Sequence, residues 1–166
     1  FSNASSDAFD SDFSSGIIQN SFFDKITGDA IDFSGSDVTV ENTIFKNIRD
    51  KAISAGEESF LKINNVEARN IGVGVASKDA SVVDIKNSSF FNYKLFALMT
   101  YNKKSFYDYP TINGENLKFD NQNSSFVRQI NSFMKINGNI IGETELDVDN
   151  LYENEIMKKW LRIDMK

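Results

Sequence analysis

A repeat of about 22 residues extends over the first two thirds of the chain and restricts the folds that it can adopt. Asparagines separated by 22, 23 and 22 residues mark it, and they are Asn20, Asn42, Asn65 and Asn87. The residue three places after each asparagine belongs to a mostly aromatic column. Its members are Phe23, Phe45, Ala68 and Phe90, and Phe1 lies one repeat before Phe23. Serines recur at the same intervals at Ser14, Ser36, Ser59 and Ser81. Such recurrence indicates a fold that stacks one small unit on the next.

The local pattern inside each repeat is alternation of apolar and polar residues. Val38-Thr39-Val40 and Leu61-Lys62-Ile63 place every second side chain on one side, as a strand does. Glycine, asparagine, serine and aspartate separate these short strands. A leucine-rich repeat has a similar period, but its Leu-x-x-Leu-x-Leu frame is absent. The sequence therefore predicts an all-β parallel solenoid.

In such a coil, residues one repeat apart become neighbours on successive rungs, each rung being one turn of the coil, at about 4.8 Å. Phenylalanine and isoleucine columns would fill the interior, and one further inward column is predicted to be Phe9, Ile31, Ile53 and Ala76. Asparagine columns suit the corners, because asparagine tolerates left-handed backbone. Proline would remove backbone donors from the ladder, and the chain has one proline.

Two segments, 28–42 and 50–54, resemble the right-handed parallel β-helix superfamily, the pectate-lyase-like group. The likeness extends over residues 1 to about 112 and concerns the fold more than the activity. Members include polysaccharide lyases, hydrolases, epimerases, phage tailspikes and surface adhesins. The resemblance implies an extracellular, periplasmic or cell-surface protein with an acidic polysaccharide as partner. The histidine motifs of the hydrolases cannot occur in a chain without histidine, and the arginine base typical of the lyases has no matching position.

The pattern divides the chain into β-helix rungs over 1–112 and a C-terminal cap over 113–166. A solenoid needs a cap because its last rung leaves apolar side chains and strand edges open. The cap is predicted to contain strands, a hairpin turn at Gly138 and a short helix begun by Asp149 or Asn150. Tyr152, Ile156 and Trp160 would form the apolar stripe of that helix. Because the chain begins at Phe1 in mid-repeat, we expect it to continue an upstream part of the same polypeptide.

Composition excludes several classes of function. The net charge of −6 and the pI near 4.7 argue against nucleic acid as a partner. The chain has no cysteine and no histidine, which excludes thiolate chemistry, Cys-based zinc sites and a Ser-His-Asp triad. No apolar run approaches the roughly 20 residues that span a bilayer, so no membrane span is predicted.

The first candidate site lies on the early rungs. Asp10, Asp32 and Ser54 should form one outward column, and Asp7, Asp29 and Lys51 a second at the entry of the same strands. Asp10, Asp32 and Lys51 are the candidate catalytic residues, because adjacent carboxylates oppose joint ionisation and can act as acid and base. Asp7, Asp10, Asp29 and Asp32 are the candidate ligands of a hard cation, with calcium as the candidate cofactor. The structural alternative is that these aspartates bond backbone N–H groups and that Lys51 neutralises them.

The second candidate site lies in the turns of later rungs. Lys78, Asp79, Tyr101 and Lys103 are the candidate substrate-binding residues, since lysines and a tyrosine along the coil suit an anionic glycan. The alternative is an ordinary salt-bridged face. Two functions therefore remain open, namely a surface that binds or processes an acidic polysaccharide, and a structural or adhesive solenoid without catalysis.

Overall fold

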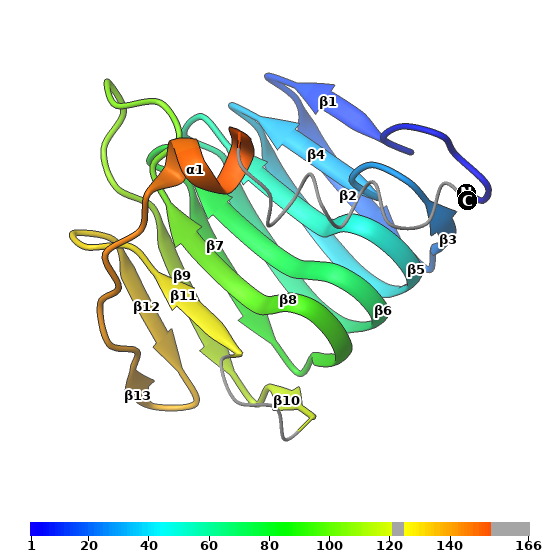
Figure 1. The fold of residues 1–166 in the computed structure, drawn as a ribbon. Coiled ribbons are helices and arrows are strands. Elements are labelled where there is room, and N and C mark those ends of the chain that lie inside the picture. Colours follow the sequence, from blue (N-terminus) through cyan, green and yellow to red (C-terminus); the bar gives the residue numbers. More distant parts are fainter. Residues whose placement is uncertain (121–124, 154–166) are drawn as a thin grey trace.

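The computed structural model describes residues 1–120 and 125–153. The chain winds as a parallel β-solenoid of about 6 turns, and strands that are one repeat apart in sequence lie side by side (Figure 1). The all-β prediction and the 22-residue spacing are therefore confirmed.

Three faces run along the coil. The first face contains β2 (Ser15–Gln19), β7 (Val82–Lys86), β9 (Thr111–Glu115), β12 (Phe133–Ile136) and the beginnings of β5 (Asp37–Gly56) and β6 (Phe60–Lys78). The second contains β3 (Phe22–Ile26), β10 (Lys118–Phe119), the middle of β5 and β6, and the beginning of β8 (Ser89–Tyr101). The third contains β1 (Asp10–Asp12), β4 (Ile31–Ser34), β11 (Phe126–Arg128) and the ends of β5, β6 and β8.

Aromatic rings stack along the interior as the repeat predicted. Phe23 pairs with Phe45 in register, and their ring centroids lie 5.1 Å apart. Phe1 stacks on Phe23 at 4.7 Å, and Phe90 on Phe119 at 5.8 Å. One predicted column is wrong by a residue, because Ile53 pairs with Val75 and not with Ala76. The register between β5 and β6 shifts after Ile48, so Ala76 lies beside Ser54 and its side chain points away from the interior of the coil.

Polar ladders hold the corners of successive rungs together. Asn42, Asn65 and Asn87 all have a positive φ, between 50° and 52°, and Nδ2 of Asn65 donates to Oδ1 of Asn42 at 2.8 Å. The serine column forms a similar ladder, in which the backbone N–H of Ser36 donates to Oγ of Ser59. A further asparagine ladder was not predicted, although its spacing is visible in the sequence, and it contains Asn47, Asn70 and Asn92.

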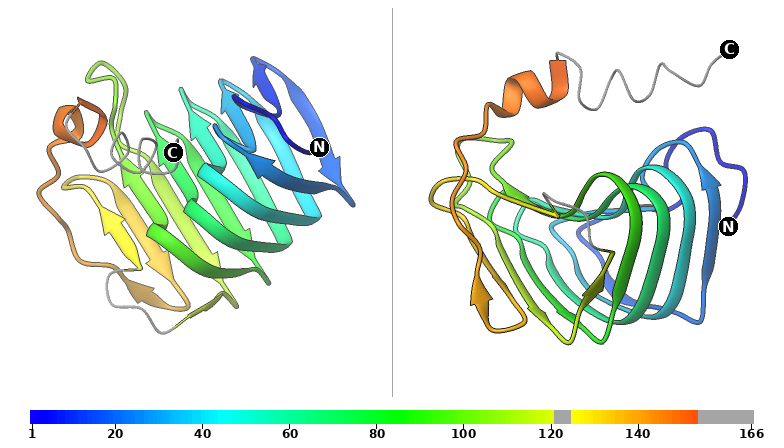
Figure 2. Two further views of the ribbon diagram at one scale, coloured as in Figure 1. Left: turned by 45° about the vertical axis from the view of Figure 1, so that its right-hand side comes forward. Right: turned by 60° about the horizontal axis from the view of Figure 1, so that its bottom comes forward.

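The parallel coil continues beyond residue 112. Strand β12 pairs in parallel register with β9, and the hairpin predicted at Gly138 then reverses the chain into β13 (Asn139–Ile140). Helix α1 (Val148–Glu153) follows and lies outside the coil (Figure 2). Its Leu151 belongs to an apolar cluster with Val73, Ala76 and Met99 on the outer side of the third face.

The beginning of this helix differs from the prediction. The side chain of Asp147 accepts the N–H of Asn150, so Asp147 is the N-cap in place of Asp149 or Asn150. The predicted stripe of Tyr152, Ile156 and Trp160 lies outside the side chains that the structure describes.

Candidate functional site

The register confirms the outward column of the first candidate site. Asp10 pairs with Asp32, and Asp32 pairs with Ser54, so the three side chains occupy successive rungs of the third face. Their exposure decreases along the coil, because Asp10 is exposed, Asp32 half-buried and Ser54 fully buried. The column continues through Ala76 and Met99, where it becomes apolar and α1 covers it.

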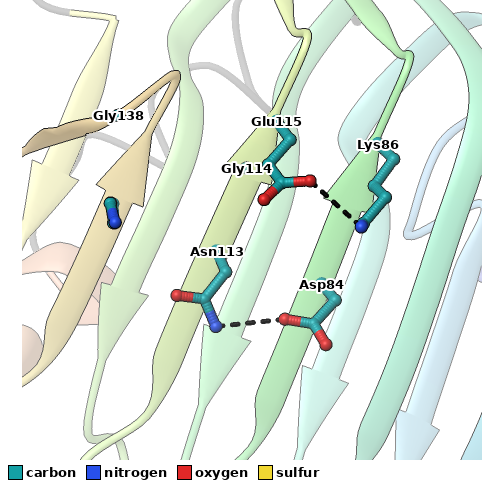
Figure 3. Close-up of a pocket in the computed structure, with 7 residues that line it drawn as sticks. Asp84, Lys86, Asn113, Gly114, Glu115 and Gly138 are labelled. Carbon is teal, nitrogen blue, oxygen red and sulfur yellow. Dashed lines mark hydrogen bonds and ion pairs between the residues drawn. The ribbon is translucent and has the colours of Figure 1, made fainter.

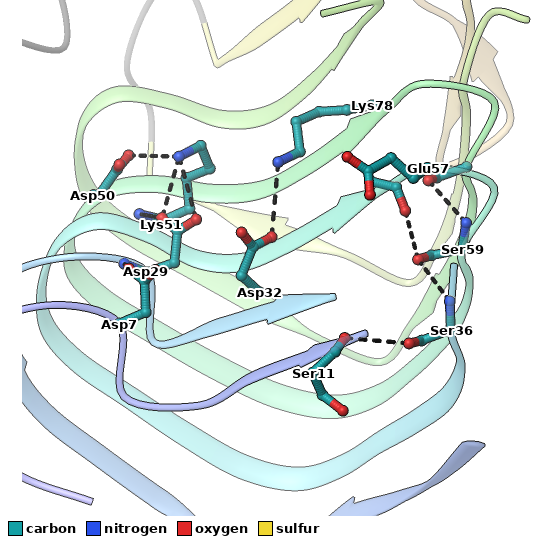
Figure 4. A network of polar contacts seen from close by, with 12 residues as sticks. Asp7, Ser11, Asp29, Asp32, Ser36, Asp50, Lys51, Glu57, Ser59 and Lys78 are labelled. Carbon is teal, nitrogen blue, oxygen red and sulfur yellow. Dashed lines mark hydrogen bonds and ion pairs between the residues drawn. The ribbon is translucent and has the colours of Figure 1, made fainter. Parts of the chain in front are cut away.

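The second column, Asp7, Asp29 and Lys51, forms a side-chain-to-backbone ladder (Figure 4). Oδ1 of Asp7 accepts the backbone N–H of Asp29 at 2.6 Å, and Oδ1 of Asp29 accepts the N–H of Lys51 at 3.0 Å. Each carboxylate therefore bonds the peptide group of the next rung. This geometry is the structural alternative stated above for these aspartates.

Lys51 places its ammonium group between two carboxylates. Nζ of Lys51 lies 3.1 Å from Oδ1 of Asp29 and 2.9 Å from Oδ1 of Asp50. Lys51 is 4% exposed and Asp29 is 5% exposed, so the ion pair is nearly removed from water. Lys51 is therefore paired with Asp29 and not with Asp32. The ion-pair partner of Asp32 is Lys78, whose Nζ lies 3.7 Å from Oδ1 of Asp32.

Burial changes the protonation of this cluster. It raises the pKa of Asp29 to about 7, although the Lys51 ammonium acts in the opposite direction. The charges of Asp50 and Asp32 raise this pKa further. The pKa of Asp10 is also raised, first by partial desolvation and then by the charges of Asp32, Asp12 and Asp7.

A pH dependence of stability follows from Asp29. Its pKa is about 3.9 in an unfolded chain and about 7 here, so the folded state holds the proton between these values. The contribution of Asp29 to stability is therefore complete below about pH 4 and is lost as the pH rises through 7. Relative to Asp29→Asn, we expect the wild type to lose stability over this window, on the order of 1.4 kcal/mol per pKa unit. Urea unfolding of both proteins from pH 4 to 8 measures it.

The exposed Asp37, varied as Asp37→Asn, controls for the loss of one negative charge. A difference between wild type and Asp29→Asn that stays constant across the window would contradict the raised pKa.

The calcium prediction receives no support from the geometry. Over residues 1–120 and 125–153, no three acidic side chains form a group that could hold a metal ion. Asp7 and Asp29 already use a carboxylate oxygen to bond the backbone. A cation on Asp7, Asp10, Asp29 and Asp32, and a catalytic role for Asp10, Asp32 and Lys51, stay predictions from the sequence.

The second candidate site lies mostly below the surface. The carboxylate of Asp79 accepts the backbone N–H groups of Lys103 and Lys104, each at 2.7 Å, and thereby holds the loop that follows β8. Tyr101 is 0% exposed and belongs to the apolar cluster under α1, and Lys78 is 8% exposed. Lys103 has an exposed side chain. A surface ligand would not contact Tyr101 or Asp79 as they lie here, so their substrate-binding role is a prediction that the geometry does not favour.

A polar groove on the first face was missed by the sequence analysis (Figure 3). It has a volume of about 380 Å³ and lies over β7, β9 and β12. Nδ2 of Asn113 donates to Oδ1 of Asp84 at 3.0 Å, and Nζ of Lys86 lies 3.0 Å from Oε2 of Glu115. Lys135 of β12 lines its far side. The alternation of β7, with Val83 and Ile85 inward, was the available signal that Asp84 and Lys86 face outward.

A second hollow continues the groove toward the middle of the coil. It has a volume of about 320 Å³, shares Asp84 and Lys86 with the first, and adds Lys62 and Asn64 of β6. Three lysines and two carboxylates line the combined surface, which gives it a formal charge of +1, whereas the whole chain has a net charge of −6. We call the surface formed by Lys62, Asn64, Asp84, Lys86, Asn113, Glu115 and Lys135 the polar groove.

Comparison of the chain with protein-family models, with curated proteins and with solved structures found no match. The likeness to the pectate-lyase-like group therefore depends on the repeat and on the solenoid itself, and a solenoid alone does not define an activity. No helix in the part of the chain that the structure describes is long and apolar enough to cross a membrane.

Proposed function

We propose that this β-helix domain binds an acidic polysaccharide along the polar groove of its first face, in an extracellular, periplasmic or cell-surface setting. The observation that supports the proposal is the row of polar side chains on successive rungs, from Lys62 through Asp84 and Asn113 to Lys135. The rungs are spaced at about 4.8 Å, which is comparable to the length of one sugar unit in an extended chain.

The chemistry of the groove suits a ligand that carries both hydroxyl and carboxylate groups. Asp84, Asn113 and Glu115 offer acceptors, and the amide of Asn113 also donates. Lys62, Lys86 and Lys135 are exposed and offer charged donors to the carboxylates of a uronate. The surplus positive charge of this groove lessens the repulsion that an anionic chain meets on an acidic protein.

Binding is favoured over cleavage by the state of the two carboxylates. Asp84 accepts a hydrogen bond from Asn113, and Glu115 is paired with Lys86. Both groups are also accessible to water, so neither lies in the dry, apolar surroundings that are typical of a catalytic acid. We therefore propose that the groove holds the polymer without cutting it.

A structural or adhesive solenoid is the second candidate function. The observation that favours it is the pair of asparagine ladders, which link successive rungs at two corners of the coil. Such ladders stiffen a rod whether or not any ligand binds.

Titration calorimetry with a soluble polyuronate tests the proposal. We expect binding that weakens with added salt, because exposed charges are screened. Replacing two of the three groove lysines together, Lys86→Gln with Lys135→Gln, should weaken binding about tenfold or more, which corresponds to ~1.4 kcal/mol. The matched control is Lys46→Gln, since Lys46 is exposed on the second face.

Absence of binding to polyuronates and to neutral polysaccharides alike would exclude the polysaccharide function and leave the structural solenoid. A similar loss in Lys46→Gln would show that attraction is unspecific. A rise in ultraviolet absorbance of the polyuronate during incubation would reveal eliminative cleavage, and would direct attention back to Asp10, Asp32 and Lys51.

A further inference from the structure

A second row of outward side chains runs beside the polar groove on the first face. The register places Phe60, Val82, Thr111 and Phe133 on successive rungs, in β6, β7, β9 and β12, which are neighbours along the coil (Figure 1). Each of them precedes a side chain of the polar groove by two residues on the same strand, so the alternation turns both outward. The two rows are therefore parallel and about 7 Å apart, which is two residues at about 3.3 Å each.

The two ends of this row carry the same pair of outward side chains. On β6, Phe60 is 57% exposed and the exposed Lys62 follows it by two residues. On β12, Phe133 is 37% exposed and the exposed Lys135 follows it by two residues. In both strands the residue between them is buried in the coil. A Phe-x-Lys unit therefore presents an aromatic ring and an ammonium group to solvent at each end of the polar groove.

Such a pair matches the two kinds of surface that a uronate offers. The face of a phenyl ring is apolar and carries partial negative charge, so it attracts the C–H groups of a pyranose ring that lies flat on it. The carboxylate of a uronate projects from the edge of the sugar ring, where the flexible stem of a lysine can bring its ammonium group to it. Phenylalanine and lysine together therefore select a sugar acid over a neutral sugar and over a small anion.

We propose that Phe60 with Lys62, and Phe133 with Lys135, form two uronate subsites at the ends of the polar groove, an inference that rests on the proposed polysaccharide function. The strands β6 and β12 are three rungs apart. At about 4.8 Å per rung, the subsites are separated by about 14 Å along the coil. A polymer that advances about one sugar per rung therefore places its first and fourth units on the two phenyl rings.

The two rungs between the subsites suit the intervening sugars. Val82 and Thr111 offer smaller, half-buried side chains beneath them, and Asp84 and Asn113 offer hydrogen bonds to their hydroxyl groups. Stacking at both ends requires flat rings, because an axial substituent would lift a sugar away from the phenyl face. The class of ligand is therefore an extended polyuronate whose ring substituents and linkages are equatorial.

Titration calorimetry with oligosaccharides of increasing length tests the subsites. The probe is a series of glucuronate oligomers joined as in cellulose, and the neutral control is the series of cello-oligosaccharides, which differ only in carrying a hydroxymethyl group in place of each carboxylate. We expect the affinity for the glucuronate oligomers to rise up to about four units and to change little beyond, because the fourth unit reaches the second subsite three rungs away. The neutral oligomers should bind roughly tenfold more weakly or less, because the lysines then have no charged partner.

Variants separate the stacking from the charge. Phe60→Ala and Phe133→Ala should each weaken the binding of four-unit oligomers of both series about tenfold, since stacking does not need the carboxylate. Lys62→Gln should weaken the binding of the glucuronate oligomer alone. The matched control is Phe22→Ala, because Phe22 is 49% exposed on a strand of the second face. Thermal unfolding of each variant verifies that the fold is retained.

Glucuronate oligomers that bind Phe60→Ala and Phe133→Ala as tightly as the wild type would overturn the two subsites and leave the polysaccharide function in place. The same conclusion would follow from an affinity that shows no step near four units. Binding of other polyuronates without binding of these oligomers would overturn the class of ligand proposed here. Failure of the proposed function is a separate result, in which the wild type binds no polysaccharide at all.

Discussion

Lys51→Met should destabilise the folded chain by roughly 3–5 kcal/mol, the usual cost of removing one partner from a buried ion pair. The ammonium of Lys51 lies within 3.1 Å of Asp29 and 2.9 Å of Asp50 and is almost inaccessible to water. Methionine retains much of the side-chain volume, so the loss reports the uncompensated carboxylates more than a cavity. Urea unfolding at pH 8, where Asp29 is mostly ionised, measures it.

Two measurements distinguish the loss of the buried ion pair from a nonspecific loss of stability. At pH 5, the loss should be smaller, because the Asp29 carboxyl, with a pKa of about 7, already holds its proton and leaves no buried charge on Asp29 for Lys51 to balance. Lys62→Met, at an exposed lysine of the first face, should change the stability by no more than about 0.5 kcal/mol. A Lys51→Met protein as stable as the wild type at both pH values would show that the buried pair contributes nothing.

Phe45→Ala should have an effect of similar size, about 3–5 kcal/mol, because it creates a cavity in the aromatic column. Phe45 is fully buried, its ring stacks on Phe23 at 5.1 Å, and Ala68 follows it on the next rung. The small side chain of Ala68 cannot fill the space that the ring leaves. Chemical denaturation with a constant m-value would show a change of stability without a change in the unfolded state.

Ile44→Ala is the matched control, since Ile44 is the preceding residue and is 45% exposed on the outside of the same strand. We expect it to cost well below half as much, because a half-exposed side chain loses less buried area. Equal losses for Phe45→Ala and Ile44→Ala would contradict the assignment of inside and outside along β5.

The columns of the coil could be predicted because a strand alternates every two residues and the repeat has a nearly constant length. Phe23 and Phe45 pair for this reason, and so do Asp10 and Asp32. The prediction was wrong at Ala76, where the pairing of β5 and β6 shifts after Ile48. The period alone contains no information on such a shift, because the shift takes place at a corner between two faces.

The repeat did not predict which side chains of the candidate sites are accessible to solvent. Asp79 and Tyr101 occupy turns and strand ends, where a polar or aromatic residue is usually exposed, yet both are buried. Tyr101 is buried within an apolar cluster that includes Leu151, a residue 50 positions later in the chain. The polar groove was missed for the related reason that its side chains come from β6, β7, β9 and β12 together.

The amino-acid sequence by itself determined the solenoid, the stacking of its main aromatic and asparagine columns and the order of Asp10, Asp32 and Ser54 on successive rungs, since all of these follow from local alternation and a nearly fixed repeat length. Only the tertiary structure decided which outward side chains meet water, how Lys51 is shared between Asp29 and Asp50, and that Asp79 and Tyr101 are buried. The physical reason is that exposure, ion pairing and cavities depend on what packs against a rung from distant parts of the chain, whereas the period describes only the rung.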